Sequence, residues 1–126
     1  RAGRAGRAPV DAVNAAELLD RAMSEDDLLH SVIDLAHLTD WHAHHCRPAQ
    51  VRDGKWVTPI QGDPGFPDLI LAKPGRLVVA ELKSARGRVT PVQAEWLDAF
   101  AGTAVEVFVW RPADWASGTI RAVLLE

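Results

Sequence analysis

The sequence has one cysteine, no long apolar run and no excess of positive charge, and each absence excludes a class of protein. Cys46 has no second cysteine to pair with inside the chain, so we expect a reducing, cytoplasmic setting. The apolar runs are far shorter than the roughly 20 residues that cross a bilayer, so we expect no membrane partner. The N-terminal arginines are not followed by an apolar segment, which argues against a secretory signal.

Charge gives only indirect information about the partner. The 14 basic residues against 17 acidic ones leave a formal net charge of -3, which is not the profile of a general nucleic-acid binder. An enzyme that holds cations in a carboxylate cluster can still be acidic overall if its basic residues lie around the site. With 126 residues and no internal repeat, the chain suits one domain with one core.

The chain divides into a tail and a domain. The Arg-Ala-Gly segment at residues 1–9 cannot bury a core, so we expect it to be disordered. Residues 11–23 could add a short helix with Asp11 as its cap. We therefore predict an N-terminal tail at residues 1–23 and a folded domain at residues 24–126.

Two helices have clear starts in the sequence. Ser24 is a good N-cap residue, and the three acids after it suit the first turn of a helix. Glu25 lies three and four residues before two leucines, so we expect it to point along the buried face. Thr90 and the proline after it open a second helix, which Gly102 ends.

Strand patterns fill the chain between and after these helices. The expected strands are residues 41–47, 56–60, 69–72, 77–83 and 105–110. Turns are predicted at residues 52–55 and 73–76. Residues 112–126 could form a short closing helix that Ser117 and Gly118 interrupt. This order predicts an α/β or α+β fold, with a sheet flanked by helices.

The turn at residues 73–76 sets a specific strand register. If Pro74 and Gly75 are its central pair, counting back along the two strands brings Asp68 opposite Glu81. Side chains that face each other in this way have Cβ atoms roughly 5 Å apart. An evenly wider loop keeps the pairing, but a bulge would shift it by one residue.

Lys83 completes a cluster with these two acids. It lies two residues after Glu81, so the two side chains share a face, whereas Leu82 points into the core. Like charges held opposite each other are destabilising and require a compensating cation. Lys83 provides one, and a divalent ion such as Mg²⁺ or Mn²⁺ suits oxygen ligands of this kind. The alternative interpretation is an amphipathic hairpin that only exposes these charges to solvent.

At these residues the sequence resembles the PD-(D/E)xK nuclease superfamily, with Pro67-Asp68, then twelve residues, then Glu81-Leu82-Lys83. A longer series of segments resembles the VRR-NUC group, the virus-type replication-repair nucleases. These segments are Gly65-Phe66-Pro67-Asp68-Leu69, Glu81-Leu82-Lys83-Ser84, Gly87, Thr90-Pro91, Gln93, Trp96-Leu97 and Val109-Trp110-Arg111-Pro112. Upstream, Ser24-Glu25 and Val32 look like the first helix of that group.

The resemblance implies a restriction-endonuclease-like core, with a mixed central β-sheet flanked by helices. It implies Mg²⁺- or Mn²⁺-dependent hydrolysis of phosphodiester bonds in DNA. The metal ligands that it implies are Asp68, Glu81, the backbone carbonyl of Leu82, and Glu25. It also implies that Lys83 handles the attacking water and that Gln93 sits beside the site.

Stand-alone members of the VRR-NUC group tend to be viral or bacterial dimers that act on branched DNA such as four-way junctions. The resemblance thus implies a DNA partner, a homodimer, and an endonuclease role in phage or bacterial replication and repair. Residues 46–61 form a longer segment than this group leads us to expect, and the net charge is acidic. The substrate class therefore stays open.

Several further residues are candidates for binding. Those that could contact phosphate are His45, Arg86, Arg88 and Lys73, followed by Arg76 and Arg111. The alternative is a solvated rim, or for His45 an ordinary strand histidine. A zinc interpretation is suggested by His42, His44, His45 and Cys46, but a structural zinc site needs a second ligand pair, and none is evident. Trp96 is predicted to lie in the core.

Two other functions compete with a nuclease. One is a catalytically silent DNA-binding or scaffold protein on the same fold. The other is a different metal hydrolase, acting on nucleotides or small phosphoesters. The set of two acids and a lysine argues against the first, because a binding module has no use for an uncompensated pair of carboxylates.

Overall fold

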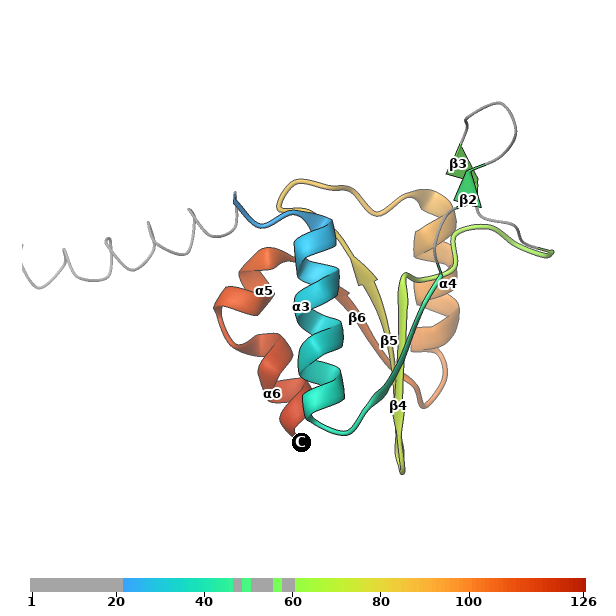
Figure 1. The fold of residues 1–126 in the computed structure, drawn as a ribbon. Helices are drawn as coiled ribbons and strands as arrows, with labels where there is room; N and C mark the ends of the chain where they lie inside the picture. Colours follow the sequence, from blue (N-terminus) through green and yellow to red (C-terminus); the bar gives the residue numbers. More distant parts are fainter. Residues whose placement is uncertain (1–21, 47–48, 51–55, 58–60) are drawn as a thin grey trace, which may run out of the picture.

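The computed structural model describes residues 22–46, 49–50, 56–57 and 61–126 (Figure 1). The predicted tail up to residue 21 and the predicted turn at 52–55 lie outside the described residues. The helices are α3 (Glu25–Leu38), α4 (Pro91–Ala101), α5 (Pro112–Ala116) and α6 (Thr119–Leu125). The strands are β1 (His42–His45), β2 (Ala49–Gln50), β3 (Trp56–Val57), β4 (Leu69–Lys73), β5 (Arg76–Leu82) and β6 (Glu106–Trp110).

Four of these strands form one mixed sheet in the order β1-β4-β5-β6. The β1–β4 and β4–β5 pairs are antiparallel, whereas β5 and β6 are parallel. Helix α4 covers one face of the sheet, and α3, α5 and α6 lie on the other (Figure 1). Strands β2 and β3 pair separately. The predicted mixed sheet flanked by helices is confirmed, and the arrangement is consistent with a restriction-endonuclease-like core.

Helix α3 begins where the sequence predicts, because Ser24 and Asp27 form a reciprocal cap. The Ser24 hydroxyl accepts a hydrogen bond from the Asp27 N–H, and the Asp27 carboxylate accepts one from the Ser24 N–H, each at 3.0 Å. The apolar residues that face the sheet are buried: Leu28, Leu29, Val32 and Ala36. Capping and burial together fix the first turn, and with it the position of Glu25.

The β4–β5 hairpin has the predicted register. Residues 74–75 form its two-residue turn, in which the glycine has a φ of 84°, and Lys73 pairs with Arg76. The pairing continues in step to the first residue of β4. Asp68, directly before β4, is therefore level with Glu81 on β5. No bulge shifts the pairing along β4.

The side chains of β5 alternate between two covered faces of the sheet. Val78, Ala80 and Leu82 belong to the main core, which also contains residues of α3 and α6. Val79 and Glu81 point to the other face, on the side of α4. Because both faces are covered, the last five residues of β5 are all buried. This burial forces the carboxyl group of Glu81 out of water.

The C-terminal residues form two short helices, α5 and α6. Gly118 lies between them with a φ of 84°, a conformation that glycine adopts readily. The predicted interruption at Ser117 and Gly118 is confirmed. In the part of the chain that the structure describes, no helix is long and apolar enough to cross a membrane.

Candidate active site

Asp68 and Glu81 are held together at the end of the β4–β5 ladder. The Leu82 N–H donates to Oδ2 of Asp68 at 2.8 Å, and the Asp68 N–H donates to Oε1 of Glu81 at 3.3 Å. The backbone beside each acid thus binds the carboxylate of the other. The structure brings together the two carboxylates that the predicted register placed opposite each other.

Lys83 stands beside this pair in an almost closed environment. Glu81 is 1% exposed and Lys83 is 8% exposed. The Lys83 Nζ lies 3.2 Å from Oε2 of Glu81. This Oε2 atom is buried and has no well-aligned hydrogen bond from the described residues. The positive charge of one amine therefore faces two carboxylates, so one negative charge at the site is left for a further cation to balance.

The electrostatic balance at Glu81 reflects this excess of acid. Burial, and after it the nearby charge of Asp68, raise the pKa of the Glu81 carboxyl to about 7. The hydrogen-bonding and charge effects of Lys83 lower the pKa but do not offset the first two causes. The site accordingly favours uptake of a positive charge, as a proton or as a metal ion.

The pKa of Glu81 leads to a prediction about the stability of the metal-free protein. The folded protein binds a proton at Glu81 up to about pH 7, whereas the unfolded chain releases it near 4.5. Unfolding free energy should therefore fall as the pH rises from about 4.5 to about 7, by a contribution on the order of 3 kcal/mol. Urea denaturation in the presence of a chelator, across this pH range, measures the effect.

Glu81→Gln provides the comparison, because glutamine resembles the protonated acid at every pH. The variant should show a flatter dependence of unfolding free energy on pH than the wild type. Glu95→Gln, at an exposed position on α4, should leave the wild-type slope unchanged. Identical slopes for wild type and Glu81→Gln would show that Glu81 does not titrate in this range.

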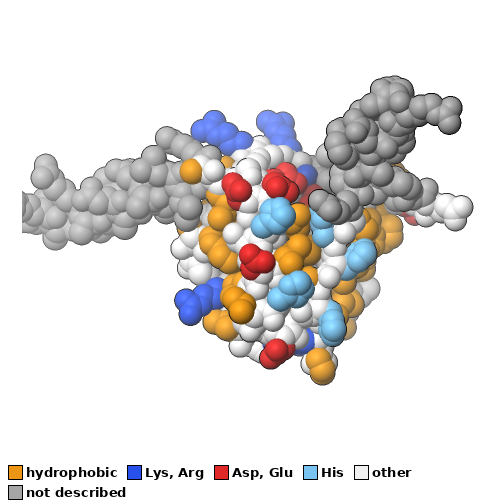
Figure 2. All heavy atoms as spheres, viewed as in Figure 1, with side chains coloured by type: hydrophobic (Ala, Val, Ile, Leu, Met, Phe, Trp, Pro, Cys, Tyr) orange, Lys and Arg blue, Asp and Glu red, His pale blue; other side chains and the backbone are white. Residues whose placement is uncertain are grey.

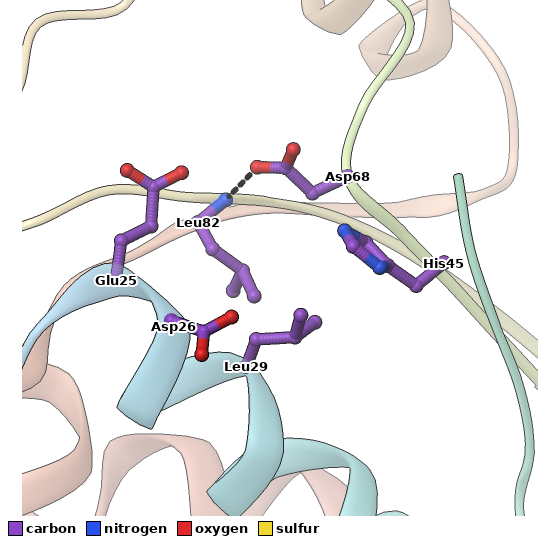
Figure 3. A pocket seen from close by; sticks show the side chains of 6 residues that line it. All are labelled: Glu25, Asp26, Leu29, His45, Asp68 and Leu82. Carbon is purple, nitrogen blue, oxygen red and sulfur yellow. Dashed lines mark hydrogen bonds between the residues drawn. The ribbon is translucent and has the colours of Figure 1, made fainter. Parts of the chain in front are cut away.

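Glu25 approaches the pair from the acidic first turn of α3, and Figure 2 shows acidic side chains gathered on this face of the molecule. It lines a pocket of about 220 Å³ with Asp26, Leu29, His45, Asp68 and Leu82. Figure 3 shows the carboxylates of Glu25 and Asp68 above this pocket, on either side of the Leu82 backbone nitrogen. Partial burial of its carboxyl group raises the pKa of Glu25; the charge of Asp68 also raises it, and Lys83 lowers it. The predicted orientation along the buried face is wrong, because the side chain is exposed, but it does face the site.

A larger cleft of about 920 Å³ adjoins the carboxylate pair. Its lining includes Glu25, His45, Asp68 and Gln93, which come from four different segments. The amide oxygen of Gln93 accepts a hydrogen bond from the Thr90 N–H at 2.9 Å, so this side chain also caps α4. The structure therefore places Gln93 beside the site, as expected, and gives it a capping role that the Thr-Pro-x-Gln pattern could have indicated.

Loop residues before Asp68 approach α4 closely at Gly65. This glycine has a φ of 94°, and a Cβ atom there would lie 2.7 Å from the carbonyl carbon and oxygen of Val92 and 2.9 Å from the nitrogen of Gln93. Only glycine fits without a shift of backbone. Contact between loop and helix thus fixes the positions of Asp68 and Gln93 relative to each other.

The other predicted phosphate-binding residues lie in different places. Arg86 and Arg88 are exposed in the loop that follows Lys83. Lys73 lies at the far end of β4, roughly 16 Å along the strand from Asp68, and its Nζ is 4.6 Å from the centre of the Trp41 ring. The structure does not bring Lys73 to the carboxylate pair, because the turn that sets the register lies at the opposite end of the hairpin.

Two arginines considered for phosphate contacts are engaged within the protein. Arg76 forms an ion pair with Glu106, with 2.6 Å between Nη2 and Oε1. The Nη1 of Arg111 donates to the carbonyl oxygens of Ser84 and Gly87, at 2.9 and 2.6 Å. Arg111 therefore holds the loop after Lys83, a structural role that nothing in the sequence pattern indicated.

The donor atoms at the site are those that a hard divalent cation prefers. Asp68 and Glu81 both offer carboxylate oxygens, and Oε2 of Glu81 is buried without a well-aligned donor from the described residues. No three His, Cys, Asp or Glu side chains among the described residues gather closely enough to hold a metal ion. An ion here would need a further ligand, and the backbone carbonyl of Leu82 is the predicted one. Among the residues considered for zinc, Nε2 of His44 lies 3.7 Å from Sγ of Cys46.

The mixed sheet and the paired acids with an adjacent lysine define the class of a PD-(D/E)xK-type nuclease domain. The VRR-NUC domain family matches residues 15–114, which is most of the chain, and the protein belongs to this family. Membership indicates a nuclease-type function. Comparisons with curated proteins and with solved structures gave no match.

Proposed function

We propose that this protein is a Mg²⁺-dependent deoxyribonuclease. Its active site, formed by Asp68, Glu81 and Lys83, hydrolyses phosphodiester bonds. The observation that carries the proposal is the reciprocal hydrogen bonding of the two acids at the end of β5, with a buried lysine 3.2 Å from one of them. A buried carboxylate beside a second acid is destabilising unless a cation is held there. This arrangement therefore favours catalysis over a purely structural role.

In this proposal, the metal ligands are Asp68, Glu81 and the Leu82 carbonyl, with Glu25 as a further acid at the pocket. Mg²⁺ or Mn²⁺ bound there would lower the pKa of a water molecule and offset negative charge on the phosphate. Asp68 and Glu81 accept no proton from the substrate, since their role is to hold positive charge. Gln93 helps to fix the edge of the cleft through its cap on α4.

Lys83 acts on the water and on developing charge. Its amine lies on the same face of β5 as Glu81, and the surrounding protein leaves it 8% exposed. A protonated amine in this position donates hydrogen bonds, so it can orient a water molecule towards the phosphorus atom. It can also stabilise the negative charge that builds up on phosphate oxygens. Its low exposure keeps competing water away.

The DNA contacts in the proposal come from Arg86 and Arg88, which are exposed after Lys83, and from His45, which lines both pockets. The resemblance implies that the protein is a homodimer and that it acts as an endonuclease on branched DNA. A sedimentation mass of one chain at micromolar concentration would argue against the dimer.

A cleavage panel tests the proposed function. Labelled junction, flap, nicked, linear and single-stranded DNAs are incubated with the protein and Mg²⁺, and matched reactions contain a chelator. We expect cleavage that requires Mg²⁺ and is fastest on a branched DNA. Metal-independent cleavage would contradict the proposal. DNA binding without cleavage would instead support the silent scaffold, and phosphate release from mononucleotides would support a different metal hydrolase.

A further inference from the structure

An aromatic cluster outside the main core lies next to the candidate active site. It consists of Phe66, Trp96 and Phe100, whose ring centroids are 5.0 to 5.9 Å apart. Phe66 meets both other rings edge to face, whereas Trp96 and Phe100 are stacked. None of the three belongs to the buried cluster between the sheet and α3. The prediction that Trp96 lies in the core is wrong.

The cluster opens onto the same cleft as the carboxylate pair. Phe66 and Trp96 both line the cleft of about 920 Å³, together with Asp68. Phe66 remains 36% exposed although its neighbour Pro67 is fully buried. Apolar surface that lines a cleft together with a few polar groups is typical of ligand-binding sites. The ring is therefore available to a ligand that extends from the site.

The backbone holds Phe66 in a defined place. Gly65 is in close contact with the start of α4, and the indole N–H of Trp96 donates to the carbonyl oxygens of Asp63 and Pro64 at 3.3 and 3.1 Å. Loop and helix are thus held together at two places just before Phe66 in the chain. An aromatic group held in this way loses little entropy when a flat ligand stacks on it.

The spacing from Phe66 to Asp68 suits a nucleic-acid strand. Phe66 and Asp68 are two positions apart in the chain, so their Cα atoms are at most about 7 Å apart. Stacked nucleotides in one strand are spaced by about 3.4 Å. A phosphate near Asp68 would therefore place a base from the next one or two nucleotides at the ring. The protein has a net charge of -3, so a stacking contact, which does not depend on basic side chains, would add to the DNA affinity that the arginines provide.

We propose that Phe66, supported by Trp96 and Phe100, stacks on an unpaired base of DNA one or two nucleotides from the scissile phosphate. The inference rests on the proposed nuclease function and adds its substrate class, which is DNA with an unpaired nucleotide at the cleavage point. A paired base is stacked on its neighbours in the duplex and cannot reach the ring without being extruded. Stacking is tolerant of sequence, so selection is for an unpaired position and not for a particular base.

A binding cycle that removes the ring and the base separately tests this proposal. The probe is a labelled duplex with a short single-stranded arm, and a second probe carries abasic sites throughout that arm. Affinity is measured by fluorescence anisotropy with Mg²⁺ in a Lys83→Met background, so that the DNA stays intact. With Phe66 present, removing the bases should weaken binding about 5- to 150-fold. With Phe66→Leu, removing them should have almost no effect.

Matched variants separate stacking from folding. Leucine at position 66 keeps an apolar side chain against Trp96, and Phe66→Tyr should restore the preference for the arm with bases because it keeps a ring. Leu38→Ala removes an exposed apolar residue at the far end of α3, and it should behave like the parent protein. A base preference of equal size with and without the ring would overturn the proposal.

The outcome is distinguishable from failure of the nuclease proposal. If the wild type cuts DNA but the cycle shows no coupling between ring and base, the stacking proposal fails and the nuclease stands. If the cycle shows coupling but no DNA is cut under any condition, the nuclease proposal fails and the aromatic binding site stands.

Discussion

Cleavage of DNA in Mg²⁺ is expected to fall about a thousandfold or more when either Glu81 or Lys83 is replaced by alanine. Glu81→Ala removes one of the two carboxylates proposed to hold the metal. Lys83→Ala removes the amine that lies 3.2 Å from Oε2 of Glu81. First-order rate constants for cleavage of a labelled junction measure the loss, and circular dichroism checks the fold.

Two exposed positions provide matched controls for these alanine variants. Glu95→Ala on α4 and Arg121→Ala on α6 remove charges of the same two signs outside the site, and both should cut at the wild-type rate. If the active-site alanine variants do not fold, Glu81→Gln and Lys83→Met keep the volume of the side chains and test the same chemistry. Wild-type cleavage by Glu81→Gln and Lys83→Met would place the active site elsewhere.

Gly65→Ala is expected to destabilise the protein by about 3 kcal/mol or more. The new Cβ atom would meet backbone atoms of Val92 and Gln93 at 2.7 to 2.9 Å, and its φ of 94° is unfavourable for alanine in any surroundings. Neither partner is a flexible side chain, so loop and helix must separate. Urea denaturation measures the change, and cleavage should fall with it because the loop carries Asp68.

Gly62→Ala separates the contact from the backbone conformation. Gly62 lies in the same loop with a φ of 109°, but no atom lies within 4 Å of an added Cβ. The Gly62→Ala variant should lose about 1 kcal/mol of unfolding free energy, which is the part due to backbone conformation alone. Equal destabilisation by the two substitutions would show that the close approach at Gly65 has no energetic weight.

Local sequence patterns predicted the helix starts and the strand register that position the site, because interactions between residues close in the chain determine both. Ser24 and Thr90 cap α3 and α4 as expected, since each hydroxyl lies three residues before the N–H that it binds. Lys73 pairs with Arg76 across a two-residue turn, and that single contact fixes Asp68 relative to Glu81. The side-chain period along a strand then places Lys83 on the face of Glu81.

Properties that depend on distant segments could not be read from the sequence. Arg111 lies more than twenty residues from the carbonyl groups of Ser84 and Gly87 that it binds, and its charge alone suggested a phosphate contact. Trp96 has the spacing of a core residue, yet the loop before β4 draws it into a separate cluster. Glu25 is exposed because it lines an open pocket with Asp68 and Leu82 and is not covered by the core.

The hydrogen bonds that join each acid to the backbone at the other affect how mutations can separate the roles of Asp68 and Glu81. Each carboxylate accepts a hydrogen bond from the backbone at the other acid, so truncating either side chain leaves a backbone N–H without its acceptor. Both acids are proposed to hold the same ion, so the effects of losing Asp68 and Glu81 on cleavage should be strongly non-additive, and the double variant should be little worse than either single one. Asparagine and glutamine keep an acceptor for the N–H, so only these substitutions can separate loss of charge from loss of alignment.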